Sequence, residues 1–271
     1  MTLPAPRPDR TCLVTGASSG IGAEIAGLLA ARGLGVTLVA RSRDKLEALA
    51  DQMGTRHGVR AEVIVADLAD GASRADIATE LESRGLTVNV LVNNAGFTTI
   101  GPVAGSDPAA EMAMVRTDVE AVVHLCSVFL AGMVERRSGA VLNVASTAAF
   151  QPIPGQAGYG ASKAFVLSYT HALRGELRGT GVTATVLCPG PVETGFAAAA
   201  GLSDSDAADA MPKVMWVPVG AVAKAAVAGM DADRAVVIPG LANRITAAAG
   251  WLSPRSVLVP MVARRHPGLG H

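Results

Sequence analysis

The chain has 271 residues, half of them hydrophobic and 17% charged, and 23 basic residues balance 23 acidic ones to a formal net charge of zero. Such a chain can bury a sizeable core, which excludes intrinsic disorder. The charge balance gives no electrostatic reason to expect a nucleic-acid partner. The length suits one large α/β domain or two small ones.

The cysteines and the N-terminus bear on the compartment in which the protein works. Three cysteines are far apart and form no Cys-x-x-Cys pair, so we expect no disulfide framework, no metal site and a cytoplasmic location. Residues 1–10 hold three prolines and three charges, which is unlike a signal peptide and predicts an N-terminal extension. We also expect no transmembrane segment, because no uninterrupted apolar run reaches the required length.

Short β-branched runs alternate with longer stretches of helical periodicity. The runs predict seven strands, at residues 11–15, 36–40, 61–66, 88–93, 140–145, 182–187 and 235–238. Helices are predicted between them, one after the glycine-rich turn to about residue 32 and others at residues 45–57, 72–84, 108–136, 158–179 and 220–230. The predicted strands are almost entirely apolar, which is typical of a sheet buried on both faces. The pattern predicts an α/β fold, with one doubly wound parallel sheet over residues 11–240.

A glycine-rich turn, from Thr15 to Gly22, joins the first predicted strand to a helix. Glycines let the backbone turn tightly and approach a ligand, and the free N–H groups of a helix start suit a pyrophosphate. The turn therefore predicts a dinucleotide site made by Gly16, Ser18, Ser19, Gly20, Ile21 and Gly22. The turn also fits Gly-x-Ser-x-Gly, the nucleophile elbow of hydrolases. That elbow needs several earlier strands, and only one precedes Ser18.

The residues after the second predicted strand indicate which dinucleotide binds. An NAD site would place an acidic residue there to bond the ribose hydroxyls, but the chain reads Ala40-Arg41-Ser42-Arg43. Arg41 and Arg43 suit the extra phosphate of NADP, and Ser42 adds a donor. We therefore expect NADP(H), with NAD(H) as the less favoured cofactor. Asp67 and Leu68 end the third strand, where a carboxylate can accept from the adenine amino group.

A catalytic group is predicted from three polar residues. Tyr159 and Lys163 are four residues apart on a predicted helix and share one face. A nearby ammonium favours the phenolate form of tyrosine, so Tyr159 can serve as general acid or base. Ser146 closes the fifth strand and can hold the substrate oxygen. These residues and the cofactor candidates all lie where strands end, and ligands of a doubly wound sheet bind there.

In combination, these motifs resemble the short-chain dehydrogenase/reductase superfamily, over about residues 11–239. The resemblance implies a Rossmann-like fold and assigns further cofactor contacts. By resemblance, Lys163 also bonds the nicotinamide ribose, and Asn93, Asn94, Ala95 and Gly96 line the adenosine ribose and brace the sheet. Val192 and Thr194, which follow Pro189 and Gly190, should hold the carboxamide and the pyrophosphate.

One position departs from the family pattern. Family members usually carry an asparagine in the long helix before the fifth strand, where it helps to hold a proton-relay water, and Asp118 aligns there. An aspartate can still hold water but adds a negative charge near Lys163. We expect an active enzyme with an altered proton relay, and count Asp118 with Ser146, Tyr159 and Lys163.

The sequence therefore predicts an NADP(H)-dependent oxidoreductase that interconverts a carbonyl and a secondary alcohol on a small-molecule substrate. The alternative is a regulatory or sensor protein that binds NAD(P) without turnover. Residues 194–216 are apolar and small, and predict a lid over an apolar substrate. The C-terminal tail, residues 241–271, is expected to pack on a neighbouring subunit rather than to cover the pocket or touch a membrane. The resemblance also implies a homodimer or homotetramer.

Overall fold

A computed structural model describes residues 3–194, 212–264 and 267–269. Its centre is a parallel sheet of seven strands in the order β3-β2-β1-β4-β5-β6-β7. The strands are β1 (Arg10–Thr15), β2 (Val36–Ala40), β3 (Ala61–Val65), β4 (Thr87–Asn93), β5 (Gly139–Val144), β6 (Val182–Leu187) and β7 (Val236–Val237). The predicted Rossmann-like sheet is confirmed, with strand ends that shift by at most one residue.

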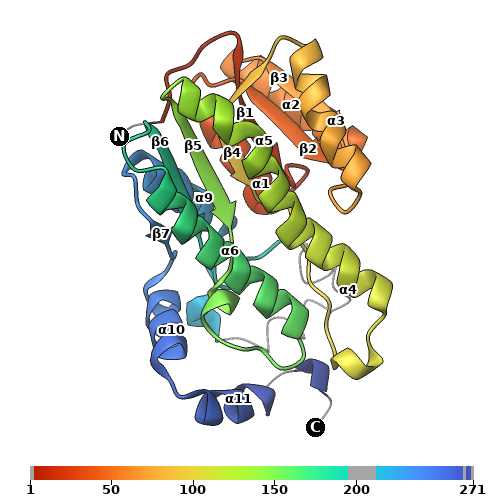
Figure 1. The fold of residues 1–271 in the computed structure, drawn as a ribbon, viewed down its shortest axis with the longest axis vertical. Helices are drawn as coiled ribbons and strands as arrows, with labels where there is room; N and C mark the ends of the chain where they lie inside the picture. The colour runs from red at the N-terminus through yellow and green to blue at the C-terminus, as the bar shows by residue number, and fades with distance from the viewer. Residues whose placement is uncertain (1–2, 195–211, 265–266, 270–271) are drawn as a thin grey trace.

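Helices cover both faces of the sheet, as Figure 1 shows with α5 and α6 in front of the strands and α1 and α9 behind them. The helices that flank the sheet are α1 (Gly20–Ala30), α2 (Arg43–His57), α3 (Gly71–Ser83), α5 (Ala121–Glu135), α6 (Ala157–Glu176) and α9 (Val219–Asp231), and α4 (Pro108–Val115) packs on α6 beyond the strands. The parallel strands β1 and β4 are neighbours in the sheet, and the order of strands runs outward from them in opposite directions. Doubly wound sheets bind their ligands at this switch point.

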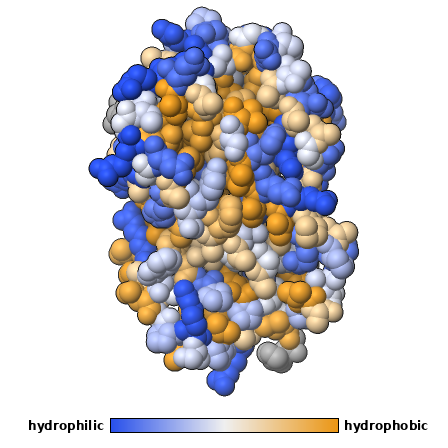
Figure 2. All heavy atoms as spheres, in the orientation of Figure 1, coloured by the Kyte–Doolittle hydropathy of each residue, from blue (hydrophilic) through white to orange (hydrophobic). Residues whose placement is uncertain are grey.

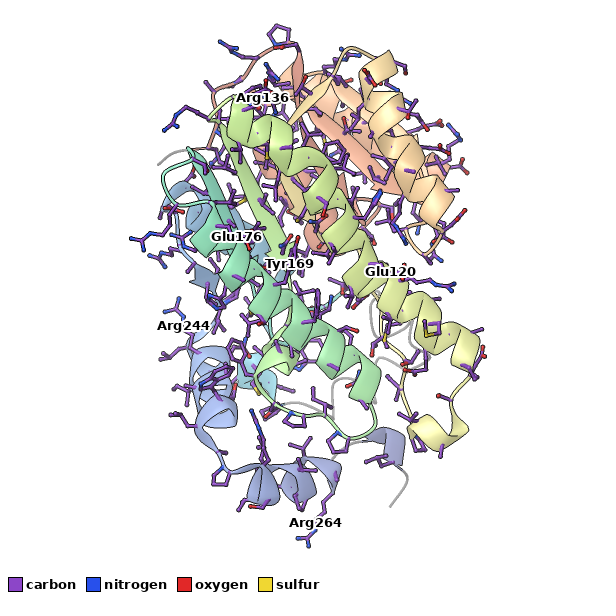
Figure 3. The ribbon with its side chains drawn as sticks, in the orientation of Figure 1. Glu120, Arg136, Tyr169, Glu176, Arg244 and Arg264 are labelled. Atoms are coloured by element: carbon purple, nitrogen blue, oxygen red, sulfur yellow. The ribbon has the colours of Figure 1, made fainter. Side chains whose placement is uncertain are left out.

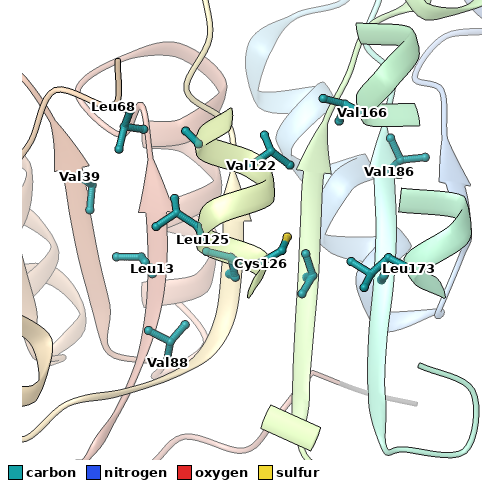
Figure 4. Close-up of a cluster of buried hydrophobic side chains, with 14 of the residues drawn as sticks. Leu13, Val39, Leu68, Val88, Val122, Leu125, Cys126, Val166, Leu173 and Val186 are labelled. Carbon is teal, nitrogen blue, oxygen red and sulfur yellow. The ribbon is translucent and has the colours of Figure 1, made fainter. Parts of the chain in front are cut away.

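Two apolar clusters hold the layers together because successive strand residues point to opposite faces. Leu13 packs with α3, α5 and α6 on one face, in the cluster that Figure 4 shows. Its neighbours Cys12 and Val14 pack with α1, α2 and α9 on the other. Strands between two such layers need apolar residues at every position, which explains the continuous runs seen in the sequence.

The helix predicted over residues 108–136 is interrupted. A π-helical turn, η2 (Arg116–Glu120), lies between α4 and α5, and the Ala121 N–H bonds the Arg116 carbonyl five residues back. One inserted residue widens the turn and rotates the residues within it. Thr117 and Asp118 are buried there as a result.

The C-terminal tail is helical. It forms α10 (Leu241–Leu252), α11 (Arg255–Ala263) and the short 3₁₀ turn η5 (Pro267–Leu269). The buried Asn243 ties α10 to the body, because its amide donates to the carbonyls of Met215 (3.0 Å) and Pro239 (2.9 Å). At the other end of the chain, Leu3 packs against the core and its N–H donates to Asp231 (3.5 Å).

Two helical stretches, Pro108–Glu135 and Lys213–Asp231, are long and apolar enough to cross a bilayer by length and composition alone. Both contain helices of the sheet layers: α5 packs on β4 and β5, and α9 packs on α1 and β6. A helix that packs an apolar face on a sheet passes the same test of length and composition, so the two stretches are weak grounds for a membrane span.

Candidate active site

One cavity of about 950 Å³ lies beyond the carboxyl ends of the strands. Nineteen of the 23 predicted site residues line it, and they come from the ends of β1 to β6 and the first turns of α1 and α6. Four do not line it: Gly22, Arg43, Asn93 and Asp118. The sheet therefore brings together the glycine turn, the arginine turn and the catalytic group, as predicted.

The glycine turn is shaped to receive a ligand closely. Gly16 and Gly20 have positive φ angles of 62° and 58°, and a Cβ on Gly16 would lie 2.8 Å from the Cα of Ala95. Ser19 is the N-cap of α1, but its side chain does not cap the helix. The first N–H groups of α1 therefore face the cavity without that partner, as a pyrophosphate site requires.

Gly22 has a packing role one turn further along. A Cβ there would lie 2.5 Å from both the Asn94 amide nitrogen and the Gly16 carbonyl oxygen. Asn94 donates in turn to the carbonyls of Thr15 (2.9 Å) and Gly16 (3.3 Å). The absence of a side chain at Gly22 lets α1 start against the end of β4, which fixes the turn.

Thr15 anchors the same turn and was not among the predicted residues. Its hydroxyl donates to the Val92 carbonyl (3.3 Å) and accepts from the N–H groups of Asn94 (2.9 Å) and Ala95 (3.0 Å). The hydroxyl thus joins the ends of β1 and β4 at the point where strand order reverses. A hydroxyl residue at a strand end, directly before a glycine, was the available signal.

The arginine turn places its two arginines differently. Arg41 and Ser42 are exposed and line the cavity at the end of β2. Arg43 starts α2 outside the cavity and pairs with Glu47 at 3.3 Å. Asp67 also lines the cavity, and its carboxylate accepts from the Ala69 N–H (2.9 Å). Arg41 therefore lies at the cavity edge, whereas Arg43 has a local ion pair outside it.

Asn93 belongs to the sheet interior. Its amide donates to the Asn143 side chain (2.8 Å), whose own amide donates to the Thr170 hydroxyl (2.9 Å). All three residues are buried. This chain of hydrogen bonds joins β4, β5 and α6, which is the bracing role that the resemblance implied, and it holds α6 in place under its catalytic residues.

Ser146, Tyr159 and Lys163 meet at the middle of the cavity. Ser146 follows β5 as the N-cap of η3 (Thr147–Phe150), and its hydroxyl accepts from the Ala148 N–H (3.1 Å). Tyr159 lies in the first turn of α6 and hydrogen-bonds Ser146. The Lys163 ammonium is 5.6 Å from the centroid of the Tyr159 ring. The predicted catalytic trio is thus assembled.

Asp118 sits directly behind Lys163. Its Oδ2 is 3.0 Å from the Lys163 Nζ, its Oδ1 accepts from the Phe97 N–H at 3.0 Å, and both charged side chains are almost fully buried. Gly96 leaves room for them, because a Cβ there would lie 2.9 Å from Asp118 Oδ1 and 3.0 Å from Lys163 Nζ. The π-helical turn therefore supplies a buried carboxylate to the catalytic lysine.

These contacts set the proton affinities of the site. Burial raises the pKa of Tyr159 above its ordinary value, and the Asp118 carboxylate acts in the same direction, against the opposing effects of Lys163 and Ser146. Burial lowers the pKa of Lys163, but Asp118 and Tyr159 outweigh it and the pKa is raised. In the free protein at neutral pH, Lys163 is an ammonium and Tyr159 carries its proton.

A family model described as short chain dehydrogenase matches residues 10–204. The chain belongs to the short-chain dehydrogenase/reductase superfamily. As a short-chain dehydrogenase it is a nicotinamide-dinucleotide-binding oxidoreductase that acts on carbonyl or alcohol groups of small molecules.

Curated relatives of this dehydrogenase include reductases. Sulfoacetaldehyde reductase 2 of Chromohalobacter salexigens is 36% identical over 201 residues, which cover 73% of this chain and 79% of that one. The very-long-chain 3-oxoacyl-CoA reductase of Anas platyrhynchos is 35% identical over 189 residues, which cover 67% of this chain and 59% of that one. The dehydrogenase thus spans about three-fifths of the second relative.

Solved structures of similar proteins agree with the fold. The short-chain dehydrogenase from Sphingobium yanoikuyae in complex with NADPH is 33% identical, with a TM-score of 0.79 over 89% of this chain and 92% of that one. The bulky-bulky ketone specific alcohol dehydrogenase from Comamonas testosteroni is 29% identical, with a TM-score of 0.74 over 88% and 91% of the two chains.

The far wall of the cavity is apolar and comes largely from the C-terminal part of the dehydrogenase. It includes Met215, the last residue of η4 (Lys213–Met215), the next residue Trp216, and Leu258, Met261 and Val262 of α11. Most of the predicted lid, residues 195–211, lies outside the described residues. The helical tail thus covers part of the pocket, a role that was considered for it but not preferred, and its cavity-lining residues were missed because no motif marks them.

Proposed function

We propose that this short-chain dehydrogenase uses NADP(H) to interconvert a carbonyl and a secondary alcohol on an apolar small molecule. The observation that carries the proposal is the Ser146–Tyr159–Lys163 group, which faces the same cavity as the glycine turn. When bound, the nicotinamide cofactor supplies or accepts the hydride. The chain's own residues hold the substrate oxygen and move its proton.

The proton steps follow from the charges around Tyr159. In reduction, the Ser146 and Tyr159 hydroxyls hold the carbonyl oxygen, and Tyr159 donates its proton to it. The Lys163 ammonium, kept charged by Asp118, stabilises the phenolate that remains. In oxidation the phenolate accepts the alcohol proton. Because burial keeps Tyr159 protonated at neutral pH, the free protein is ready for reduction.

The fit to NADP rests on two turns. The glycine turn forms a cradle that any Cβ at Gly16 would fill, at the start of a helix whose N-cap side chain is not engaged there. Arg41, exposed at the cavity edge in place of an acidic residue, suits the additional phosphate. The apolar far wall suits a fatty or aromatic ketone better than a sugar.

Replacing Tyr159 with phenylalanine tests the catalytic proposal. Y159F keeps the ring and removes the proton donor, so kcat for an apolar ketone should fall by at least about a hundredfold, while NADPH still raises the melting temperature as in the wild-type protein. A panel of aliphatic, aromatic and sugar carbonyls supplies the substrate. If the wild-type protein binds NADPH and reduces nothing, it is a cofactor-binding sensor instead. If Y159F leaves turnover unchanged, Tyr159 is not the proton donor.

A further inference from the structure

Helix α10 presents its small residues to the protein and its large apolar residues to solvent. Its buried face is made by Asn243, Ala247 and Gly250. The side chains of Leu241, Ile245 and Leu252 are 73%, 61% and 80% exposed. These three recur at helical spacing along one face. A surface helix of a globular protein normally turns such residues inward, so this face is built for a partner.

The apolar surface continues across the turn into α11. Trp251 is 62% exposed with only its edge against Phe150, at 6.3 Å between ring centroids, and Val257 is 64% exposed. Of the eleven large hydrophobic side chains exposed among the described residues, six lie in these two helices: Leu241, Ile245, Trp251, Leu252, Val257 and Met261, the last of which also lines the cavity. Figure 2 shows apolar side chains at the surface of this lower end, with polar ones among them.

The charged residues of the same C-terminal segment are all basic or neutralisable histidines, with no acidic residue. Residues 241–271 contain four of the 23 basic residues and none of the 23 acidic ones, which leaves residues 1–240 with a net charge of −4. Arg244 and Arg264 are exposed, and Figure 3 shows Arg264 projecting from the end of the molecule. Arginines beside exposed leucine and tryptophan are the composition of helices that lie in the surface of an anionic bilayer.

We propose that α10 and α11 dock this protein on a membrane surface that carries anionic headgroups. The apolar side chains enter the boundary between headgroups and acyl chains, and the arginines pair with phosphate groups. A second copy of the chain is a poorer occupant, because a two-fold contact through this surface would bring Arg244 and Arg264 of both copies together, and residues 241–271 contain no acidic residue to pair with them. The proposal does not rest on the proposed catalysis, although α11 also lines the cavity.

Vesicle flotation of the full chain tests the proposal, with vesicles of phosphatidylcholine alone or of equal parts phosphatidylcholine and phosphatidylglycerol. We expect the protein to float with the anionic vesicles and to be released by high salt, since the arginine contribution is screened. Two variants at residues that do not line the cavity separate the apolar from the electrostatic contribution to vesicle binding. Leu252→Ser and Arg264→Glu should each weaken binding about tenfold.

Matched controls carry the same changes elsewhere. Val128→Ser on α5 and Arg178→Glu, before β6, should bind as the wild-type protein does, and melting curves confirm that all four variants fold. Failure of the wild-type protein to float, or equal binding by Leu252→Ser, overturns the proposal. A mass halved by Leu252→Ser in sedimentation, without vesicle binding by the wild-type protein, would instead make this surface an interface between copies.

Discussion

At the scale of single residues, Asp118 most distinguishes this site. The carboxylate is fully buried and 3.0 Å from the catalytic ammonium, so it holds Lys163 charged while raising the pKa of Tyr159. An asparagine would keep the acceptor for the Phe97 N–H and lose the charge. Asp118 therefore makes the phenolate of Tyr159 harder to form and keeps the tyrosine protonated at neutral pH, which favours reduction.

The pH dependence of alcohol oxidation tests this account. Oxidation needs the phenolate, and the pKa of Tyr159 is raised, so kcat/KM for an alcohol should climb with pH through neutrality into the alkaline range. In Asp118→Asn a cause of that rise is gone, and the climb should move about one pH unit lower. An unmoved profile would mean that Asp118 does not act on Tyr159.

Stability provides a second measurement on the same pair. Asp118→Ala leaves Lys163 buried without its carboxylate and should cost about 3–5 kcal/mol in the free energy of unfolding. Asp118→Asn retains the hydrogen bond to Phe97 and should cost less. Urea denaturation of both variants measures the difference, and equal costs would show that the charge itself contributes nothing to folding.

Arg41 and Arg43 provide a matched pair for cofactor choice. Arg41 lines the cavity, whereas Arg43 lies outside it and pairs with Glu47. Arg41→Ala should weaken NADPH binding about tenfold or more, because charge-assisted hydrogen bonds to the additional phosphate are lost. NADH lacks that phosphate, so its binding should be unchanged. Arg43→Ala should change neither, as measured by thermal shift with each cofactor. Equal losses in both variants would show a shared phosphate site.

At the scale of elements, the start of α1 depends on one close approach. A Cβ at Gly22 would lie 2.5 Å from a backbone oxygen, whereas one at Gly27, on the same helix, meets only the Met53 methyl at 3.9 Å. Gly22→Ala should destabilise the protein by about 1–3 kcal/mol and lower NADPH affinity. Gly27→Ala should stabilise it by about 0.5–1 kcal/mol. Thermal melting distinguishes them, and matching shifts would rule out the contact.

Elements whose residues repeat at a fixed period were predictable, and the others were not. The seven strands and the sheet helices follow from apolar runs and helical spacing, and the strand ends that they predict bring the trio and the two turns together. The π-helical turn at Arg116–Glu120 has no sequence signature, because its extra residue leaves the apolar pattern of a long helix nearly intact. Thr15 has a local signal, a hydroxyl residue directly before the first glycine of the turn, whereas the α11 wall depends on tertiary contacts that no local pattern contains.

At the scale of the whole molecule, the far cavity wall should govern which substrates are accepted. Met215 lines the cavity, while its neighbour Val214 is 75% exposed and lies outside it. Met215→Ala enlarges the wall and should change the ratio of kcat/KM for bulky and small ketones by about tenfold. Val214→Ala should leave the ratio unchanged. The same ratio in both variants would place the substrate elsewhere in the cavity.

The cytoplasmic location and the homodimer or homotetramer remain predictions.

The cavity draws its two halves from separate lengths of chain. Each predicted cofactor and catalytic residue lies at or before Thr194, within the stretch shared with the family, whereas the wall from Pro212 to Val262 lies beyond it. Chemistry and selectivity are therefore inherited on different segments. Exchange of the C-terminal segment, in evolution or by engineering, can therefore change the range of substrates while the cofactor-binding and catalytic residues stay the same.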